Sequence, residues 1–428
     1  MKVLGLITEY NPFHNGHAYH LEASKKETGA THTVAVMSGH FLQRGEPAIF
    51  DKWTRAKMAV MAGVDLVLEL PAAYSSQSAE LFAFGSVLTL DSIRVVDSIC
   101  FGSESGDITR LSAIAKILEN EPAKFQALLK EQLDSGLTFP RARQAALGLF
   151  IDGASSSYGL SSRDALAVLK SPNNILSIEY LKNLLRLGSD IAPATVRRIA
   201  ADYNSTQISG SICSATAIRE CLRQGASLES ISSVVPPASY ALMCSAVAAG
   251  LTPVTEDSLL DILSYAVISK SDRLSRFWEV REGMDNKIRA EIRRASSYEE
   301  LLANLKSKRY TMTAIKRMLM NIVLGIEKED VEAFRSLDSI PYIRILAFND
   351  NGAKLLKQIK QSSDVAIINK MPQLDSISDD IMRRMLRYDI DSTDIFNIVY
   401  YAGCKTMLRG SMDYMISPAY ITKKNRES

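Results

Sequence analysis

Ile7–His20 reads ITEYNPFHNGHAYH and continues from the short apolar run KVLGLI. It holds three of the chain's five histidines, and all five lie within the first 40 residues. His14 and His17 are three residues apart, which places both imidazoles on one face at the start of a helix. An apolar run, a turn with Pro and Gly, and a helical pattern over Asn15–Lys26 predict a strand that leads directly into a helix.

The same alternation continues through the first 100 residues. Apolar, β-branched runs lie at Lys2–Ile7, Thr33–Met37, Asp65–Leu70 and Val95–Phe101, with helical patterns at Asn15–Lys26, Lys52–Ala62 and Ser78–Ser92 between them. This pattern is typical of βαβ units with a parallel sheet. A later run, Ala192–Ile199, is expected to add a strand, followed by a helix at Ala215–Arg223. Parallel sheets bind ligands at the carboxyl ends of their strands, so the functional site is expected there.

The pattern changes along the chain. Residues 107–187 read as helices, and amphipathic helical patterns dominate from about residue 240 to 400. VVPPAS at Val234–Ser239 is interpreted as a linker. We therefore expect an α/β, Rossmann-like N-terminal domain over residues 1–235 and a mostly α-helical C-terminal domain over residues 240–428.

Composition restricts the class of protein. The chain has 428 residues, 46% of them hydrophobic and 23% charged, as in soluble globular proteins. The net charge is only +2, so any basic surface must be local. Five scattered cysteines without C-x-x-C spacing argue against a zinc site or a disulfide framework. No apolar segment is long enough for a signal peptide or a membrane span. We expect a cytoplasmic protein with no membrane or DNA partner.

The H-x-G-H motif at His14–His17 suits phosphate chemistry. A helix N-terminus presents unpaired N–H groups and a positive partial charge to an anion. Two imidazoles at that position can donate to phosphate oxygens, and Gly16 allows a flat ring or a sugar to approach the backbone. A zinc site or a purely structural turn is the alternative. A zinc site needs further ligands, and only carboxylates and distant cysteines are available.

A second motif, SGSICSATAIRE, follows the last expected strand. Ser214 and Thr216 supply hydroxyls at a helix start, and Arg219 lies on the same face one turn later. Serine and threonine caps are common, so this motif alone is weak. Together with H-x-G-H in one α/β domain, it predicts a two-part phosphate clamp.

This pair of motifs resembles the HIGH nucleotidyltransferase superfamily. The surrounding segments EYNPFHNGHAYHL, VMSGHFLQRGEPA, DLVLELP, FGSESGD, GLTFPRAR and SPNNILSIEY resemble one family in it, the bacterial tRNA(Met) cytidine acetate ligases. The resemblance covers most of the first 225 residues and is looser beyond them. It implies an enzyme that uses ATP to form acetyl-AMP from acetate. Such an enzyme then acetylates N4 of the wobble cytidine of elongator tRNA(Met).

The resemblance also implies site residues. His14 and His17 are the expected catalytic pair. The implied ATP-binding set is Ile7, Thr8, Glu9, Tyr10, Asn11, Pro12, Phe13, His14, Asn15, Gly16, His17, Ala18, Tyr19, His20, Gly102, Asn173, Arg197, Arg198, Ser214, Thr216 and Arg219. Asn173 could instead simply cap its helix. Arg197 and Arg198 point to opposite faces of a strand, so at most one faces the nucleotide, and Arg198 is favoured. Mg²⁺ is expected with ATP, without a dedicated carboxylate cage and without another metal.

The segment SGHFLQRGEPAIFDKWTRAKMA allows two interpretations. Lys52, Arg55 and Lys57 form either a solvated basic face or a site for acetate or tRNA. Family members usually carry a smaller polar residue at the position of His40, which could alter selectivity near the carboxylate substrate.

A basic cluster lies in the C-terminal half. Residues 287–317 hold nine Lys or Arg and three Glu. Phosphate neutralisation supplies most of the affinity for RNA, and aromatic side chains stack on unpaired bases. The expected tRNA-binding residues are Lys287, Arg289, Arg293, Arg294, Lys308, Arg309, Lys316 and Arg317, with Tyr298 and Tyr310 nearby for stacking. An ordinary exposed helical face is the alternative.

Two other functions remain open. A nucleotidyltransferase that adenylates or cytidylates a small phosphorylated cofactor precursor would use both phosphate motifs, but it leaves the basic cluster without a role. A tRNA-binding protein that uses ATP only structurally is the other.

Overall fold

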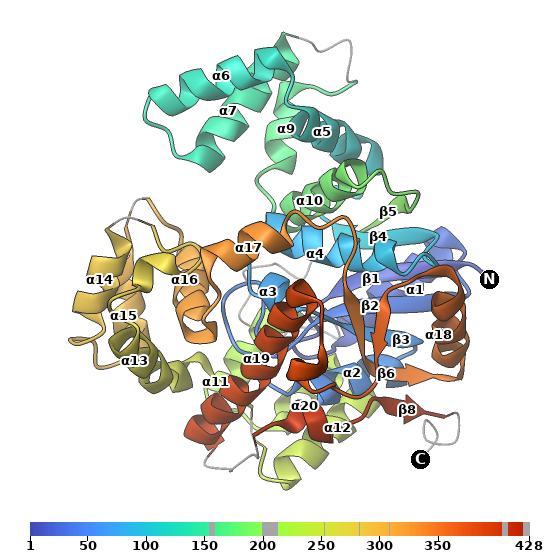
Figure 1. Cartoon of the computed structure of the whole chain (residues 1–428). Coiled ribbons are helices and arrows are strands. Elements are labelled where there is room, and N and C mark those ends of the chain that lie inside the picture. The colour runs from blue at the N-terminus through green and yellow to red at the C-terminus, as the bar shows by residue number, and fades with distance from the viewer. Residues whose placement is uncertain are drawn as a thin grey trace.

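The computed structural model describes residues 1–153, 159–198, 213–251, 253–281, 283–307, 309–404 and 410–422. Within these ranges one eight-stranded sheet runs through the molecule (Figure 1). Its strands are β1 Val3–Thr8, β2 His32–Ser38, β3 Leu66–Leu70, β4 Ser98–Ser103, β5 Ala192–Arg197, β6 Tyr342–Asn349, β7 Ala366–Ile368 and β8 Ala419–Ile421. The order is β5-β4-β1-β2-β3-β6-β7, with β8 also paired to β6.

Helices cover both faces of this sheet and extend beyond it (Figure 1). Those of the first half are α1 Asn15–Thr28, α2 Lys52–Met61, α3 Ala72–Ser75, α4 Ala79–Ser92, α5 Ile108–Asn120, α6 Ala123–Asp134, α7 Phe139–Asp152, α9 Ser162–Val168, α10 Pro172–Arg186 and α11 Ala215–Arg223. Those of the second half are α12 Pro237–Ala248, α13 Leu259–Ser269, α14 Met284–Glu291, α15 Tyr298–Leu305, α16 Met312–Leu324, α17 Lys328–Phe334, α18 Asp350–Ser362, α19 Asp380–Cys404 and α20 Met412–Met415. None of the described helices has the length and apolar character required to cross a membrane.

Strand alternation divides the core between the two faces of the sheet. Val34 and Val36 of β2 pack on one face in a cluster that also contains residues of α4 and α10. Ala35 and Met37 pack on the other face with residues of α1 and α2. Successive strand residues point to opposite faces, so a strand covered on both sides reads as a continuous apolar run. The predicted α/β class with a mostly parallel sheet is therefore confirmed, because β1, β2, β3, β4 and β5 pair in parallel.

The C-terminal half also contributes strands, which the sequence pattern did not predict. β6 pairs antiparallel to β3, while β7 and β8 pair parallel to β6. The residue 235–240 boundary therefore does not separate the sheet from the rest of the chain. β7 and β8 are only three residues long, and β6 lies among helical patterns, so periodicity alone did not reveal them.

The interpretation of Val234–Ser239 as a linker is also wrong. Val234 and Val235 are buried, and Pro237 is the first residue of α12. Proline is favoured in the first turn of a helix because its missing N–H would have no partner there. The same residue type that suggested a break in the chain therefore begins a helix.

A buried ion network joins the two halves of the chain. Lys52 Nζ lies 2.7 Å from Glu69 Oε1 and 2.9 Å from Asp413 Oδ1. Arg344 NH2 lies 2.6 Å from Asp413 Oδ1, and Arg344 is the β6 partner of Glu69 on β3. All four side chains are buried, so Lys52 does not belong to a solvated basic face. Lys52, whose charge suggested a surface position, instead belongs to an ion network that connects α2, β3, β6 and α20.

Candidate active site

His14 and His17 form the start of α1. His14 is the N-cap residue, and its Nδ1 accepts a hydrogen bond from the Gly16 backbone N–H at 3.0 Å. The His14 backbone N–H donates to Nδ1 of His17 at 3.3 Å. Because both Nδ1 atoms accept, the proton of each neutral imidazole is assigned to Nε2. The capping arrangement therefore gives each ring one N–H donor that the cap does not use.

Burial keeps these imidazoles neutral. Together with the positive charges of Arg198 and Arg219, burial lowers the pKa of His14 to about 3. Burial and the neighbouring His14 hold the pKa of His17 well below its usual range. Burial and Arg198 lower the pKa of His20 to about 4. At neutral pH the histidines are therefore neutral donors, and arginines supply the positive charge.

Aromatic packing fixes the turn that precedes the helix. Tyr10 adopts a left-handed backbone conformation with φ 47°, and its ring lies 5.0 Å from the ring of His17. Phe13 is buried, with its ring 5.6 Å from that of His17. The His14 and His17 rings are 3.8 Å apart. A rigid turn of this kind holds both imidazoles in one orientation, as a preorganised site requires.

Arg198 and Asn173 meet beside the histidines. Arg198 NH1 donates to Oδ1 of Asn173 at 3.3 Å. A Cβ at Gly102 would stand 3.1 Å from Arg198 Cγ and 3.6 Å from His20 Cδ2, so these residues are direct neighbours. Arg197 instead packs against Gly106, which separates the two arginines as strand geometry predicts.

Sequence reasoning missed the group that orients Asn173. Glu104 accepts from the Asn173 side-chain amide at 2.7 Å and from the Asn174 backbone N–H at 2.9 Å, at the start of α10. Asn174 Oδ1 in return accepts from the Glu104 backbone N–H at 3.0 Å. The signal was present in the segment FGSESGD, because a carboxylate after a strand can bind a neighbouring helix N-terminus.

Arg219 approaches the motif from α11. Its NH1 donates to the backbone oxygen of Asn11 at 3.1 Å, and its NH2 lies 3.0 Å from Glu46 Oε1. Thr216 Oγ1 accepts from the same NH2 at 3.5 Å, whereas Ser214 caps α11 by accepting from Ala217 N–H. The structure thus brings the H-x-G-H turn and the S-A-T-A-I-R helix together.

Arg219 pairs with Glu46, and the pKa values of three carboxyl groups in this region are shifted. Burial raises the pKa of Glu9, although its carboxylate accepts from the Gln43 backbone N–H at 2.8 Å. Burial opposes the ionisation of Glu46, but the positive charge of Arg219 prevails and lowers its pKa. Burial and the neighbouring Glu46 raise the pKa of Glu256 to about 7. No group of three or more His, Cys, Asp or Glu within the described ranges could hold a metal ion.

The remaining predicted residues of the segment 7–20 differ in exposure. Tyr19 is 41% exposed. Asn15 donates from its side chain to the Ser233 backbone oxygen at 3.0 Å, and Thr8 Oγ1 donates to the Val36 backbone oxygen at 3.5 Å. Pro12 is buried, and Ile7, Gly16 and Ala18 are partly buried.

His40 is a packing residue in this structure. Its Nε2 accepts from the Lys52 backbone N–H at 3.3 Å, and its ring stacks on Phe396 at 4.4 Å. It is 1% exposed. His40 therefore lies between α2 and α19 and does not face an open site.

The predicted tRNA-binding residues are only partly available. Ion pairs engage Lys316 with Glu256 at 2.5 Å and Arg317 with Glu279 at 3.2 Å. The side chains of three further residues donate to backbone oxygens: Lys287 to Leu305, Arg289 to Ser271 and Arg293 to Arg289. Arg293, Arg294 and Arg309 are exposed, and Lys308 lies outside the described residues. Tyr298 is 4% exposed within a helical core, so the expected base stacking by this ring is wrong.

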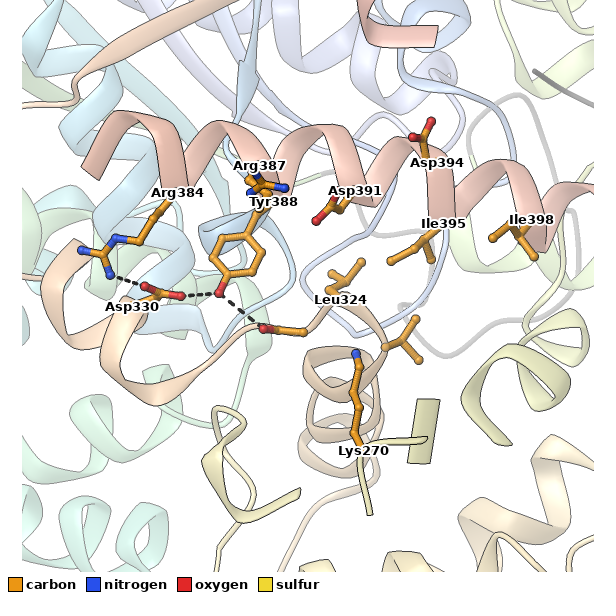
Figure 2. Close-up of a pocket in the computed structure, with 12 residues that line it drawn as sticks. Lys270, Leu324, Asp330, Arg384, Arg387, Tyr388, Asp391, Asp394, Ile395 and Ile398 are labelled. Carbon is orange, nitrogen blue, oxygen red and sulfur yellow. Dashed lines mark hydrogen bonds and ion pairs between the residues drawn. The ribbon is translucent and has the colours of Figure 1, made fainter. Parts of the chain in front are cut away.

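A cavity of about 520 Å³ lies away from these residues, along one face of α19 (Figure 2). Tyr388 donates to the Gly325 backbone oxygen at 3.3 Å, and both Tyr388 and Arg384 contact Asp330. Figure 2 shows Asp391 and Ile395 on the same helix face, opposite Leu324 and Lys270. None of the predicted site residues lines this cavity.

Known proteins resemble this chain along nearly its whole length. The HIGH Nucleotidyl Transferase family model matches residues 1–409. A tRNA(Met) cytidine acetate ligase from Acetivibrio thermocellus is 43% identical over 404 residues, which cover 94% of this chain and 95% of that protein. A tRNA(Met) cytidine acetate ligase from Clostridium perfringens is 42% identical over 419 residues, which cover 98% of this chain and 99% of that protein. A crystal structure of Thermotoga maritima TmcAL bound with alpha-thio ATP matches this chain with a TM-score of 0.89 at 33% identity. The match covers 99% of this chain and 100% of that structure's chain.

Proposed function

The chain belongs to the HIGH nucleotidyl transferase family, and on that premise we propose that it is a tRNA(Met) cytidine acetate ligase. It uses ATP to activate acetate and transfers the acetyl group to N4 of the wobble cytidine of elongator tRNA(Met). Two features support this proposal: relatives with that name match over nearly the full length, and the two phosphate motifs meet in the fold.

The observation that carries the proposal is the arrangement around the start of α1. His14 and His17 each have an Nε2–H donor that the helix cap does not use. Arg219 donates to the Asn11 backbone oxygen in the same turn, and Arg198 lies beside His20 of α1, so both guanidinium groups lie close to that donor pair. Neutral donors and fixed cations at a helix N-terminus are what a triphosphate requires.

The chemistry proceeds in two steps. An acetate oxygen attacks the α-phosphorus of ATP and forms the acetyl-AMP anhydride, and the bond to the β-phosphate oxygen breaks and releases pyrophosphate. The cytidine N4 then attacks the acetyl carbon, AMP leaves with the anhydride oxygen, and N4 loses a proton. His14, His17, Arg198 and Arg219 stabilise the phosphate charge that develops in the first step, so the rate derives mainly from positioning and electrostatics.

We further propose that Mg²⁺ arrives with ATP and is held mainly by phosphate oxygens and water. This fits the ion's usual preference for one or two carboxylates plus substrate phosphates. Arg293, Arg294 and Arg309 are exposed and are the proposed contacts to tRNA phosphates. A tRNA substrate accords with the cytoplasmic location expected from the scattered cysteines.

One assay tests the proposed function. The protein is incubated with ATP, Mg²⁺ and labelled acetate, with elongator tRNA(Met) or with a transcript whose wobble cytidine is replaced by uridine. We expect acetate-dependent pyrophosphate release, and label in the cytidine transcript alone. Label in neither transcript, or pyrophosphate release that requires a small phosphorylated substrate, would contradict the proposal.

A further inference from the structure

Glu46 connects α11 to the second half of the chain. Its Oε1 lies 3.0 Å from Arg219 NH2, and the two side chains are 11% and 19% exposed. The carboxyl group of Glu46 is also hydrogen-bonded to that of Glu256, in the short helix η2 Glu256–Ser258. Glu256 Oε2 in turn lies 2.5 Å from Lys316 Nζ on α16. Side chains from four separate segments therefore form one continuous series of contacts that ends at Arg219.

The backbone around Glu46 forms a tight turn that packs against α16. Leu42 N–H donates to the Glu46 backbone oxygen at 2.9 Å, and Gly45 N–H donates to the Leu42 backbone oxygen at 2.8 Å. Gly45 has φ +72°, and a Cβ at this position would lie 2.5 Å from the Arg317 backbone nitrogen. Such a close approach leaves the turn little freedom, because interiors are packed without spare volume. The turn therefore presents the Glu46 carboxylate to Arg219 from a fixed direction.

Arg219 depends on Glu46 for its orientation. Its NH1 donates to the Asn11 backbone oxygen at 3.1 Å, whereas the contact between NH2 and Thr216 Oγ1 is long, at 3.5 Å. Among the described residues, Glu46 is the only carboxylate within ion-pair distance of Arg219. A charge-assisted hydrogen bond of this kind fixes the guanidinium before a ligand binds. The clamp then does not lose the rotational freedom of a long side chain when a phosphate arrives.

A shared proton stabilises the contact between Glu46 and Glu256. Two carboxyl groups in contact do not both ionise readily, because like charges repel. Burial and the neighbouring Glu46 raise the pKa of Glu256 to about 7. Burial opposes the ionisation of Glu46, but the charge of Arg219 prevails and lowers its pKa. Glu256 therefore retains its proton up to about neutral pH and donates it to Glu46, which stays ionised beside Arg219.

We propose that Glu46 is a positioning residue that holds the Arg219 guanidinium against the H-x-G-H turn, with Glu256 and Lys316 supporting Glu46 from the second half of the chain. The inference rests on the proposed function, because it concerns the phosphate clamp of that reaction. Glu46 acts on the phosphates only through Arg219. Its role is to orient this cation before charge develops on the α-phosphate, which is the condition for electrostatic stabilisation of a transition state.

Glu46→Gln and Glu46→Ala separate the hydrogen bonds of this residue from its charge. Glutamine keeps an oxygen that accepts from Arg219, and its amide N–H donates to Glu256, so both contacts survive without the negative charge. Alanine removes both contacts. Glu279→Ala is the matched control, because Glu279 Oε2 lies 3.2 Å from Nε of Arg317 on the same helix α16. That side chain is 17% exposed, and no described contact joins it to Arg219.

The measurement is transfer of labelled acetyl groups to elongator tRNA(Met), with kcat determined at saturating ATP and ATP binding measured directly. We expect kcat to fall about tenfold to a hundredfold in Glu46→Ala, the effect of one hydrogen bond between charged groups. In Glu46→Gln kcat should stay within about threefold, because the orienting contact remains. The ATP dissociation constant should change by less than about threefold in both variants, because loss of orientation and loss of a competing negative charge oppose each other. Glu279→Ala should match the unaltered protein.

A double-mutant cycle tests whether Glu46 acts through Arg219. We expect Arg219→Ala to lower kcat about 10²- to 10³-fold, as loss of a preorganised group does. Adding Glu46→Ala to Arg219→Ala should change kcat by less than about twofold, because the residue that Glu46 orients is then absent. A role of Glu46 in the packing of the turn alone would instead lower kcat further in the double variant, by the same factor as in the single one.

Each result decides a separate question. A normal kcat in Glu46→Ala, equal losses in Glu46→Gln and Glu46→Ala, or multiplied losses in the double variant would overturn the positioning role. A loss in Glu279→Ala as large as that in Glu46→Ala would show a general disturbance around α16 and would also overturn it. If the unaltered protein transferred no acetyl group to tRNA, the proposed function itself would fail, whatever the variants did.

Discussion

His14→Asn separates the structural role of His14 from its proposed contact with phosphate. The imidazole Nδ1 caps α1 by accepting from Gly16 N–H at 3.0 Å, and the side chain is 6% exposed. Asparagine is among the best N-cap residues, whereas an alanine in place of a capping side chain costs about 1 kcal/mol. His14→Asn should therefore keep the free energy of unfolding within about 0.5 kcal/mol, and His14→Ala should lose about 1 kcal/mol.

The activity of these variants should behave differently. Asparagine is shorter than histidine and cannot place a donor where Nε2–H lies, so both variants lose the proposed phosphate contact. Loss of one preorganised donor typically lowers kcat about 10²- to 10³-fold, or about 2.7–4 kcal/mol. The assay combines urea unfolding with acetate-dependent pyrophosphate release. If His14→Asn turned over normally while His14→Ala did not, His14 would be a cap and nothing more.

The other predictions concern pH, RNA binding and packing. Burial lowers the pKa of His14 to about 3, so below about pH 6.5 this imidazole is protonated in the unfolded chain but not in the folded protein. The free energy of unfolding therefore decreases as pH falls. Between pH 6 and 4 the unfolding free energy of His14→Asn should therefore fall less steeply, by up to about 1.4 kcal/mol per pH unit, and parallel slopes in urea titrations would contradict this. Replacing exposed Arg293 and Arg294 with alanine should weaken tRNA binding and reduce the slope of log K against log salt by about 1.5, with ATP binding unchanged; an unaltered slope would remove them from the interface. Gly45→Ala should lower stability by about 2–3 kcal/mol, because φ is +72° and the new Cβ would lie 2.5 Å from the backbone nitrogen of Arg317. A melting temperature within about 1 °C of that of the unaltered protein would refute the close approach.

Local patterns were sufficient for the first half of the chain. The apolar run before ITEYNPFHNGH became β1, the pattern after it became α1, and the ends of both agree within two residues. Strands buried on both faces and helices with clear caps have strong local signals, so they can be read without tertiary information. The short strands β7 and β8 lack such signals, because pairing with β6 rather than composition makes them strands.

Side-chain roles depended on partners distant in sequence. Lys52 and Arg55 lie three residues apart on α2, and the sequence could describe them only as basic residues. The fold buries both, pairs Lys52 with Asp413 from the other end of the chain, and turns Arg55 toward four backbone oxygens. Tyr298 was misassigned for the same reason, because a helical aromatic residue can face either RNA or a core.

The sequence by itself determined the α/β class, the turn with His14 and His17, and the pair of motifs that predicts a phosphate site. These properties arise from residues within one strand, turn and helix, whose preferences are local. Only the tertiary structure decided that Arg198 rather than Arg197 meets Asn173 and that Arg219 reaches the Asn11 carbonyl. It also decided that Lys52 and Arg344 are paired with carboxylates, since compensation of a buried charge depends on every segment packed around it.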